Sequence, residues 1–470
     1  MILPLLLLAM QAAAPAHTRL AARIRAAIAS SPVTRSAFWG IEIADAKTGR
    51  VLYASNADHF FVPASNAKLF TTALGLIRLG PDFRFRTQVA VEAGNLVIRG
   101  AGDPNLSGRE IPYRIGSLPG DPLAAIEDLA SQIQASGLRE VPGDVIGDDT
   151  AFPYQPFPEG WQIDDSALDD AAPVSALALN DNEIDLLIRG GVEETDPAVV
   201  TWNPDIPVLE LSNEVLTDSR VERNLHFERL PGSPRARVWG TIPRGDPGQT
   251  FTLAVDDPAR YAALALRAAL IRRGISVKGE ARARHRLPGS PPFRLKKPVA
   301  PIATRVSPPL LEDLRVIDKV SQNLHAEMIL RLASVDNADS LHDFLTEAGV
   351  PDDRYTFTDG SGLSRLDMVT PHAVTTLLRY MAASPQRENW LSLLPISGVD
   401  GTLSSRFAAR ISKGHIRAKT GSLTHVATLS GYIERRDGRL LAFSILVNNF
   451  NGPASDIRAI IDRICTITLE

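Results

Sequence analysis

Ser65 and Lys68 are the first two residues in the chain whose types and spacing could perform covalent chemistry. A serine acts as a nucleophile when a base lies within hydrogen-bond reach, and positions i and i+3 of a helix share one face. Apolar residues recur with a helical period after Pro63, so Ser65 is expected near a helix N-terminus, where the helix dipole favours a developing oxyanion. Among the eight lysines, only Lys68 follows a serine at this spacing, which makes the pair a candidate nucleophile and base.

Two further motifs follow in chain order. Ser321-Gln322-Asn323 is the one Ser-x-Asn sequence in the chain, and the apolar period places it inside a predicted helical stretch, residues 310–332. Lys419-Thr420-Gly421 is expected to open the first strand of a C-terminal hairpin, whose strands are predicted at 424–433 and 440–447. These three motifs in this order are the signature set of penicillin-binding proteins and class A β-lactamases.

A second Lys-Thr-Gly sequence, Lys47-Thr48-Gly49, needs a separate interpretation. It precedes Ser65 and joins a segment of alternating polarity, residues 38–45, to the start of a return strand at Val51. Such residues between two strands are typical of a hairpin turn. This copy is therefore predicted to be structural.

The composition limits the class of protein. Hydrophobic residues make up 44% of the 470 residues and charged residues 22%, which are ordinary values for a globular protein. The net charge of −4 disfavours nucleic acid as a partner. Cys465 is the single cysteine, so no disulfide can form within the chain. The nine histidines show no metal-ligand spacing, and we expect neither a metal site nor a cofactor.

The N-terminus resembles a secretory signal peptide. Residues 1–10 are nearly all apolar, and small residues follow as far as Ala16. The apolar run is shorter than the roughly 20 residues that span a bilayer. We expect residues 1–16 to be removed by cleavage after Ala14 or Ala16, leaving a periplasmic or otherwise extracytoplasmic protein with no transmembrane anchor. Because no Lys or Arg precedes the apolar run, a frayed apolar terminus is the alternative.

The middle of the chain differs from its two ends. Residues 85–301 are rich in proline and glycine, with short strand-like pieces and two predicted helices, at 122–136 and 258–273. This pattern predicts one or two compact subdomains. A final helix is expected at about 455–464.

Several further segments carry a resemblance to a known family. The first two motifs are 256 residues apart, which is too far for a common β-lactamase and fits a large insertion. The chain resembles the class C low-molecular-mass penicillin-binding proteins, the D-alanyl-D-alanine carboxypeptidase/endopeptidase group, over nearly its whole length. The segments that carry this resemblance are Gly102-Asp103-Pro104, residues 143–146, Gly160-Trp161 with Asp164-Asp165, and residues 172–177, 359–365 and 394–403.

The resemblance implies an α/β (α+β) fold with a penicillin-binding, transpeptidase-like domain. An antiparallel sheet flanked by helices would be built from residues 17–86 and 305–470. Residues 87–304 would form the insertion, as β-rich subdomains.

The resemblance also implies roles for the motif residues. Ser65 would attack the D-Ala-D-Ala carbonyl, and Lys68 would accept its proton. Ser321 would relay a proton toward the leaving amine, and Asn323 would hold the substrate amide and Lys68. Lys419, Thr420 and Gly421 form the carboxylate-binding motif, and the backbone N–H groups of Ser65 and Ser422 would form the oxyanion hole.

Three more residues match positions that line the family's cleft. Asp165 matches the acidic residue that meets the free end of the diamino acid in the stem peptide, and Arg365 and Thr424 fall at neighbouring positions. The family usually has an aromatic residue five positions after this aspartate, where this chain has Asp170. We therefore expect an acidic edge to the peptide pocket.

The predicted function is hydrolysis of D-Ala-D-Ala and D-Ala–diaminopimelate bonds in peptidoglycan stem peptides, with inhibition by β-lactams such as penicillin. Two alternatives remain. The same residues could serve a β-lactamase or esterase, although the sequence shows no clear deacylating glutamate. An inactive wall-binding scaffold is disfavoured because every motif residue is intact.

Overall fold

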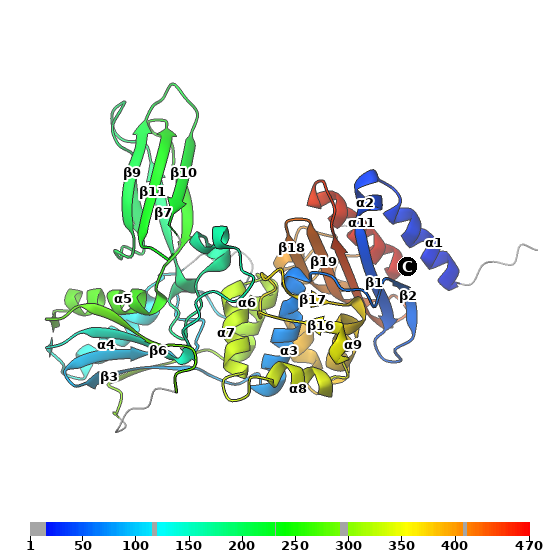
Figure 1. Ribbon diagram of the computed structural model, residues 1–470, viewed down its shortest axis with the longest axis horizontal. Coiled ribbons are helices and arrows are strands. Elements are labelled where there is room, and N and C mark those ends of the chain that lie inside the picture. Colours follow the sequence, from blue (N-terminus) through cyan, green and yellow to red (C-terminus); the bar gives the residue numbers. More distant parts are fainter. Residues whose placement is uncertain (1–15, 115–119, 231, 292–298, 408–410) are drawn as a thin grey trace, which may run out of the picture.

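The computed structural model describes residues 16–114, 120–230, 232–291, 299–407 and 411–470 (Figure 1). The predicted signal segment, residues 1–16, lies outside this part of the chain except for Ala16. Helix α1 (Ala16–Ile28) begins at that residue. No helix within the described ranges combines the length and apolar character needed to cross a membrane.

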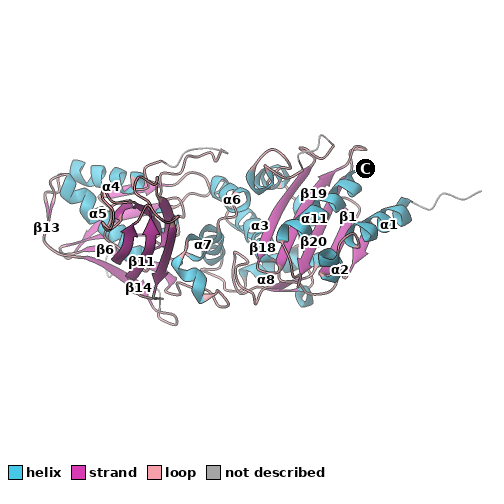
Figure 2. Cartoon of the chain, turned by 90° about the horizontal axis from the view of Figure 1, so that it is seen from above, coloured by secondary structure: helices cyan, strands magenta, loops and turns pink. Residues whose placement is uncertain are grey.

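The two ends of the chain form one five-stranded antiparallel sheet. Strand β1 from the N-terminal segment pairs with β20 from the C-terminal segment, for example at Trp39 and Val447 (Figures 1 and 2). The expectation of an antiparallel sheet built from both ends is confirmed. The strands, in spatial order, are β18 (Ile416–Leu423), β19 (Val426–Glu434), β20 (Leu440–Asn448), β1 (Phe38–Asp45) and β2 (Val51–Ser55).

Helices cover both faces of this sheet, which explains why β19 and β20 are buried almost continuously rather than in alternation. Helices α1 and α11 (Ala454–Leu469) pack on one face. On the other face, a second cluster of buried hydrophobic residues includes residues of α3 (Lys68–Arg78). The further helices on that side are α6 (Leu310–Lys319), α7 (Asn323–Ala333), α8 (Ser340–Glu347), α9 (Pro371–Ala383) and α10 (Arg387–Leu393).

The turns within this sheet follow from local chemistry. Gly438 has φ +80°, a conformation that favours glycine, and it lies in the turn that joins β19 to β20, the hairpin predicted from residues 424–433 and 440–447. The early Lys-Thr-Gly copy lies in the β1–β2 turn, where the Thr48 N–H donates to Asp45 Oδ1. That copy is a turn, as predicted.

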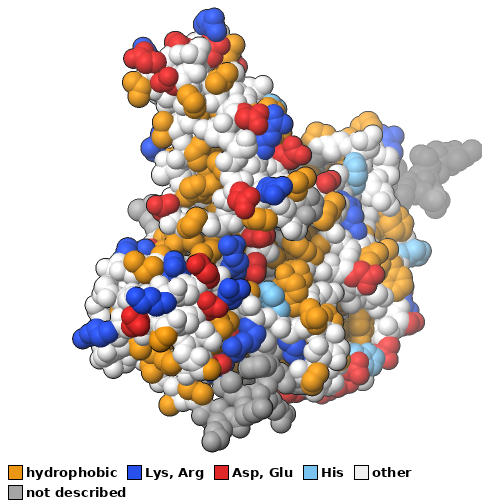
Figure 3. Space-filling view, turned by 60° about the vertical axis from the view of Figure 1, so that its left-hand side comes forward, with side chains coloured by type: hydrophobic (Ala, Val, Ile, Leu, Met, Phe, Trp, Pro, Cys, Tyr) orange, Lys and Arg blue, Asp and Glu red, His pale blue; other side chains and the backbone are white. Residues whose placement is uncertain are grey.

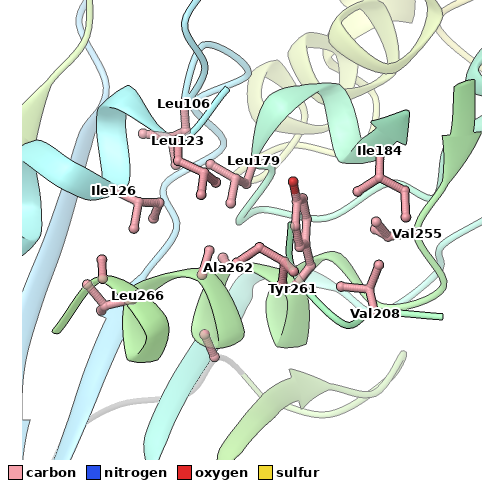
Figure 4. Packing of buried hydrophobic residues seen from close by; sticks show 14 of the residues in the cluster. Leu106, Leu123, Ile126, Leu179, Ile184, Val208, Val255, Tyr261, Ala262 and Leu266 are labelled. Atoms are coloured by element: carbon pink, nitrogen blue, oxygen red, sulfur yellow. The ribbon is translucent and has the colours of Figure 1, made fainter. Parts of the chain in front are cut away.

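The middle of the chain builds a second five-stranded sheet, covered by α4 (Ala124–Ala135) and α5 (Pro258–Arg272). Figure 4 shows its core, where Tyr261 and Leu266 of α5 face Ile126 and Leu179. The strands, in spatial order, are β14 (Ala281–Arg286), β6 (Val145–Pro153), β4 (Asn95–Arg99), β3 (Arg86–Glu92) and β15 (Ala303–Val306).

Smaller sheets extend this inserted region. A three-stranded arm projects away from the rest of the molecule in Figure 1, and hydrophobic side chains lie along it among charged ones in Figure 3. The arm consists of β9 (Glu210–Thr217), β10 (Asn224–Arg229) and β11 (Arg235–Ile242). The sheet at its base consists of β7 (Glu183–Arg189), β8 (Val199–Asn203) and β12 (Gln249–Ala254), and β5 (Glu140–Val141) pairs with β13 (Ser276–Val277). The predicted domain boundaries near residues 86 and 305 stay predictions; they fall in β3 and β15.

One helical prediction is wrong. Residues 310–332 do not form a single helix, because α6 ends at Lys319 and α7 begins at Asn323. Ser321 lies between them with φ +71°, a left-handed conformation that cannot continue a right-handed helix. The Gln322 side chain accepts a hydrogen bond from Leu324 N and caps α7.

The prediction of which strand contains the last Lys-Thr-Gly motif is also wrong. The motif does not open the strand of residues 424–433; it lies in a separate strand, β18, which is antiparallel to β19. The C-terminal segment therefore contributes three strands rather than two. Strand β18 is hard to recognise in the sequence because the charged residue Lys419 interrupts its apolar positions. In the structure the Lys419 side chain is nevertheless buried.

Candidate active site

Ser65 lies in a single 3-10 turn, Ala64–Ala67, that leads directly into α3. Ala64 just before it has φ +48°, and such backbone strain concentrates at functional sites. Two hydrogen bonds hold the turn against the main sheet. Asn66 Nδ2 donates to Lys419 O (2.9 Å), and Thr428 Oγ1 donates to Pro63 O (3.0 Å).

Lys68 occupies the first turn of α3 with its side chain fully buried. Its Nζ lies 2.9 Å from Ser65 Oγ, 2.6 Å from Asn323 Oδ1 and 2.6 Å from Ser361 O. The last two groups can only accept hydrogen bonds. A neutral amine satisfies all three contacts, because its two N–H groups go to the two carbonyl oxygens and its lone pair faces the Ser65 hydroxyl.

The environment of Lys68 favours this neutral form. Burial lowers the pKa of Lys68 well below its ordinary value, and the nearby charge of Lys419 lowers the pKa further. The carboxylates of Asp359, Asp318 and Asp170 oppose this shift without cancelling it. A larger fraction of Lys68 is therefore neutral at a given pH than in an exposed lysine, and the neutral amine is the form that a general base needs.

Ser321 meets Lys419 across the cleft. Lys419 Nζ donates to Ser321 Oγ over 2.7 Å and to Thr420 O over 3.1 Å. Because the ammonium group supplies the proton of the first bond, the Ser321 hydroxyl keeps its own proton to donate elsewhere.

The inserted region anchors the segment that carries Ser321. Gln322 Nε2 donates to Asp181 Oδ2 over 3.1 Å, and His325 Nε2 lies 3.0 Å from Asp181 Oδ1. Asp181 belongs to the insertion, and His325 is fully buried on α7. The insertion thus fixes the position of the second motif.

Asn323 has both ends of its amide engaged. Its Oδ1 accepts from Lys68, and its Nδ2 donates to the backbone carbonyl of Asp170 over 2.8 Å. Asp170 is the residue expected to replace an aromatic, and it lines the cleft beside Asn323. Its carbonyl fixes the orientation of the Asn323 amide.

Gly421 allows β18 to approach the nucleophile turn. A β-carbon at this position would lie 2.2 Å from Thr428 Oγ1 and 3.0 Å from Ser65 N. Both distances are shorter than ordinary van der Waals contact, so only glycine fits without displacement. The neighbouring backbone N–H groups of Ser65 and Ser422 are the pair expected to form the oxyanion hole.

We predict that Gly421→Ala lowers the rate of penicillin acylation by about 10²–10³-fold, the usual effect of losing one oxyanion-hole donor. The added methyl group would push β18 away from Ser65 N. Stopped-flow measurement with a fluorescent penicillin would test this, with the melting temperature measured in parallel. A folded variant that acylates at the wild-type rate would contradict the close-approach argument.

A cleft of about 450 Å³ contains nine of the eleven predicted site residues, and Lys68 and Lys419 lie buried beside it. Ser65 and Ser321 face the cleft from the nucleophile turn and the α6–α7 junction. The predicted residues that line it are Ser65, Asp165, Ser321, Asn323, Arg365, Thr420, Gly421, Ser422 and Thr424.

Arg365 spans one part of this cleft. Its Nε donates to Gln162 Oε1 over 2.9 Å, and its Nη2 donates to Thr424 O over 3.1 Å. Gln162 lies in the loop of the insertion that also carries Asp165. Arg365 therefore links the insertion to the β18–β19 turn beside the motif residues.

Ser361 and Asp359 belong to none of the three motifs, although both lie in a segment that carries the family resemblance. Ser361 supplies the carbonyl that accepts from Lys68. Asp359 Oδ2 accepts from Ser361 Oγ and from Trp161 Nε1, both over 2.6 Å. Burial alone would raise the pKa of Asp359, but these hydrogen bonds and one from Asp367 lower it. Asp359 thus couples the insertion loop to the Lys68 site.

Thr402 is a further contact that the sequence did not predict. Thr420 Oγ1 donates to Thr402 Oγ1 over 2.8 Å. Thr402 belongs to the segment of residues 394–403, whose Asp400 accepts from Lys319 Nζ over 2.5 Å. This segment therefore positions Thr420 of the third motif through the hydrogen bond with Thr402.

Comparison with known proteins identifies the family to which the chain belongs. The D-Ala-D-Ala carboxypeptidase 3 (S13) family matches residues 20–468. A D-alanyl-D-alanine carboxypeptidase of Actinomadura sp. (strain R39) is 31% identical over 456 residues, covering 91% of this chain and 81% of that protein. The D-alanyl-D-alanine carboxypeptidase DacB of Haemophilus influenzae is 23% identical over 418 residues, covering 84% and 82%.

Solved structures show the same fold. The crystal structure of penicillin-binding protein 4 (DacB) from Haemophilus influenzae superposes with a TM-score of 0.78 at 22% identity, covering 94% of this chain and 97% of that one. The same protein complexed with a β-lactam superposes with a TM-score of 0.72. The predicted fold class and family resemblance are confirmed.

Proposed function

Because the chain belongs to the S13 family of D-Ala-D-Ala carboxypeptidases, the class C penicillin-binding proteins, we propose that Ser65 is the nucleophile that cleaves D-Ala-D-Ala bonds in peptidoglycan stem peptides. The observation that carries this proposal is the position of Lys68 Nζ, 2.9 Å from Ser65 Oγ and 2.6 Å from two carbonyl oxygens, where a neutral amine would present its lone pair to the Ser65 hydroxyl.

The first half of the reaction forms an acyl-enzyme. Lys68 Nζ accepts the Ser65 hydroxyl proton while Oγ attacks the carbonyl carbon of the penultimate D-Ala. The N–H groups of Ser65 and Ser422 stabilise the oxyanion. As the C–N bond breaks, the Ser321 hydroxyl donates a proton to the leaving amine, and D-Ala departs. Ser321 regains a proton from Lys68, which returns to its neutral form, while Lys419 keeps its own proton with Nζ 2.7 Å from Ser321 Oγ.

The second half returns the enzyme to its starting state. A water molecule loses a proton to Lys68 and attacks the ester carbonyl. The C–O bond to Ser65 breaks, and Ser65 Oγ takes the proton back. Penicillin follows the first half, because opening of its β-lactam ring forms the same Ser65 ester and the tethered amine cannot depart.

The terminal carboxylate of the substrate binds at the third motif. Lys419 supplies a buried positive charge, and Thr420 supplies a hydroxyl that lines the cleft. A charge-assisted contact of this kind explains the requirement for a free D-Ala carboxylate. The ring carboxylate of a β-lactam would occupy the same position.

The experiment that tests this function is acylation of the purified protein with labelled penicillin, followed by peptide mass spectrometry. The adduct is expected on the peptide containing Ser65. An adduct on a different residue, or no adduct with folded protein, would refute the proposal. Release of D-Ala from a pentapeptide then establishes carboxypeptidase action.

We further propose that the protein cleaves D-Ala–diaminopimelate cross-links as a DD-endopeptidase. The cleft extends past the motif residues to Asp165 and Arg365, which come from different parts of the chain. The half-buried carboxylate of Asp165 would bind the free ammonium group of the diamino acid. Turnover of a cross-linked dimer beside a pentapeptide separates the two activities.

We predict that Asp165→Asn raises KM about 10- to 100-fold for peptides with a free diaminopimelate amine, the value of a charge-assisted hydrogen bond. The rate of penicillin acylation should stay near wild type, because penicillin has no such amine. Asp164→Asn is the matched control, since its neighbouring carboxylate is exposed and does not line the cleft. Equal KM changes in both variants would show a general charge effect instead.

Peptidoglycan lies outside the cytoplasmic membrane, so the proposed substrate requires export. We therefore propose a periplasmic or otherwise extracytoplasmic location. The apolar segment of residues 1–16 would direct it and then be removed. Mass spectrometry of the exported protein tests this, and a Met1 terminus on that protein would contradict cleavage.

A further inference from the structure

Glu327 is a buried carboxylate that the proposed mechanism does not use. It lies on α7, one helical turn after Asn323, and its side chain is buried. Its Oε2 accepts a hydrogen bond from Gly360 N over 2.7 Å, and its Oε1 accepts one from Arg331 Nε over 2.8 Å. The first contact connects α7 to the segment that carries the Ser361 carbonyl.

Gly360 packs closely against both helices beside the site. A β-carbon at this position would lie 2.8 Å from Leu330 Cβ and 2.9 Å from Ala326 O on α7, and 3.2 Å from Thr71 Oγ1 on α3. The first two distances are shorter than ordinary van der Waals contact, so only glycine fits here without displacement. The backbone at Gly360 is therefore in direct contact with α3 and with α7.

Hydrogen bonds fix this backbone from both sides. On the α7 side the Gly360 N–H donates to Glu327, and on the α3 side the Gly360 carbonyl accepts from Thr71 Oγ1 over 2.7 Å. The next carbonyl along the chain is that of Ser361, 2.6 Å from Lys68 Nζ. Since Gly360 immediately precedes Ser361, the hydrogen bond with Glu327 helps to set where this acceptor lies.

Helix α7 thus places both carbonyl acceptors of Lys68. Asn323 supplies one of them directly through Oδ1, and Glu327 holds the segment that supplies the other, Ser361 O. A neutral amine presents its lone pair to Ser65 only when its two N–H groups point at these two oxygens. The positions of both acceptors therefore control how well Lys68 can accept the proton.

We propose that Glu327 is a positioning residue, whose carboxylate fixes the backbone that presents the Ser361 carbonyl to Lys68. Glu327 is not among the residues that line the cleft, so its effect on the reaction would pass through this backbone. The inference rests on the proposed function, since it assigns a role only if Lys68 activates Ser65.

The test measures penicillin acylation by stopped flow in Glu327→Leu, resolved into a dissociation constant for the first complex and a rate constant for acylation. Leucine is similar in size but cannot accept from Gly360 N. The rate constant should fall about 10- to 100-fold, because a misplacement of about 1 Å can cost about 10²-fold. The dissociation constant should stay near that of the wild type, because the lining of the cleft is unchanged.

Glu327→Gln tests rescue by a conservative exchange. Glutamine lacks the charge but keeps an oxygen that can accept from Gly360 N, so this variant should recover most of the acylation rate constant. Arg331→Met is the matched control. It removes the ion pair of Glu327 while the contact with Gly360 remains, and its rate constant should stay near that of the wild type.

A purely structural role for the ion pair predicts a different pattern. All three variants would then lose thermal stability to a similar extent, and the rate constant of the folded protein would not change. If Glu327→Leu does not fold, Glu327→Asp tests the same contact, because it keeps the charge but its carboxylate is one methylene farther from Gly360 N. Its rate constant should fall as well.

The positioning role would be overturned by a wild-type rate constant in folded Glu327→Leu or, in its place, Glu327→Asp. Equal losses in Glu327→Leu and Glu327→Gln would overturn it too, as would a change in the dissociation constant alone. Wild-type protein that forms no Ser65 adduct would instead refute the proposed function, so the two failures are distinguishable.

Discussion

Replacing Ser65 with alanine should abolish covalent labelling by penicillin and lower peptide turnover by about 10⁴–10⁶-fold, the range found when a serine peptidase loses a residue of its catalytic group. The physical reason is that no other atom can form the acyl bond. In the cleft, Ser321 Oγ already accepts a hydrogen bond from the Lys419 ammonium group, which is a donor and not a base. Quantitative labelling and D-Ala release measure the two losses separately.

The variant should remain folded and bind β-lactam reversibly, because the wall of the cleft and the buried lysines are unchanged. Ser30→Ala is the control for a serine-to-alanine exchange, since the Ser30 hydroxyl donates to Ala27 O at the end of α1, away from the cleft. Retained covalent labelling in Ser65→Ala would place the nucleophile elsewhere. Loss of labelling together with loss of reversible binding would indicate misfolding instead.

The sequence predicted the site better than it predicted the elements that carry it. Lysine scarcity singled out Lys68, and the order of three short motifs then predicted residues that do share one cleft. Such motifs can be recognised in a sequence because acyl transfer needs particular residue types. The strands that position them need only hydrophobicity and shape, which many sequences supply.

Two errors have physical causes. Ser321 adopts φ +71°, and the apolar period of α6 and α7 runs through it because both helices pack on the same core. Periodicity cannot report one strained residue. Strand β18 was missed because Lys419 is a charged residue, which usually lies at the surface, whereas here its side chain is buried. Sites of function are where the local rules of a fold are most often broken.

The role of Ser361 could not be predicted for a different reason. Ser361 contributes a backbone carbonyl, which every residue possesses, so its type carries no signal. Only the folded chain brings this carbonyl to Lys68 Nζ, 293 residues away in sequence.

Lys68→Arg should lower acylation by about 10³-fold or more, although it keeps a cation at the same place. A general base contributes about 10²–10⁴-fold. Arginine stays protonated in proteins, so the variant has no lone pair to accept the Ser65 proton. The planar guanidinium also cannot reproduce the three contacts of Lys68 Nζ. Single-turnover acylation with labelled penicillin measures the loss.

The pH profile makes this prediction specific. Raising the pH should not rescue Lys68→Arg, because its side chain does not deprotonate in the accessible range. Lys319→Arg is the contrasting exchange, since Lys319 forms an ion pair with Asp400 and needs its charge. Lys319→Arg should lower the acylation rate far less than Lys68→Arg. If Lys68→Arg kept most of its activity, Lys68 would act as a fixed charge, and the base for Ser65 would have to be another group in the cleft.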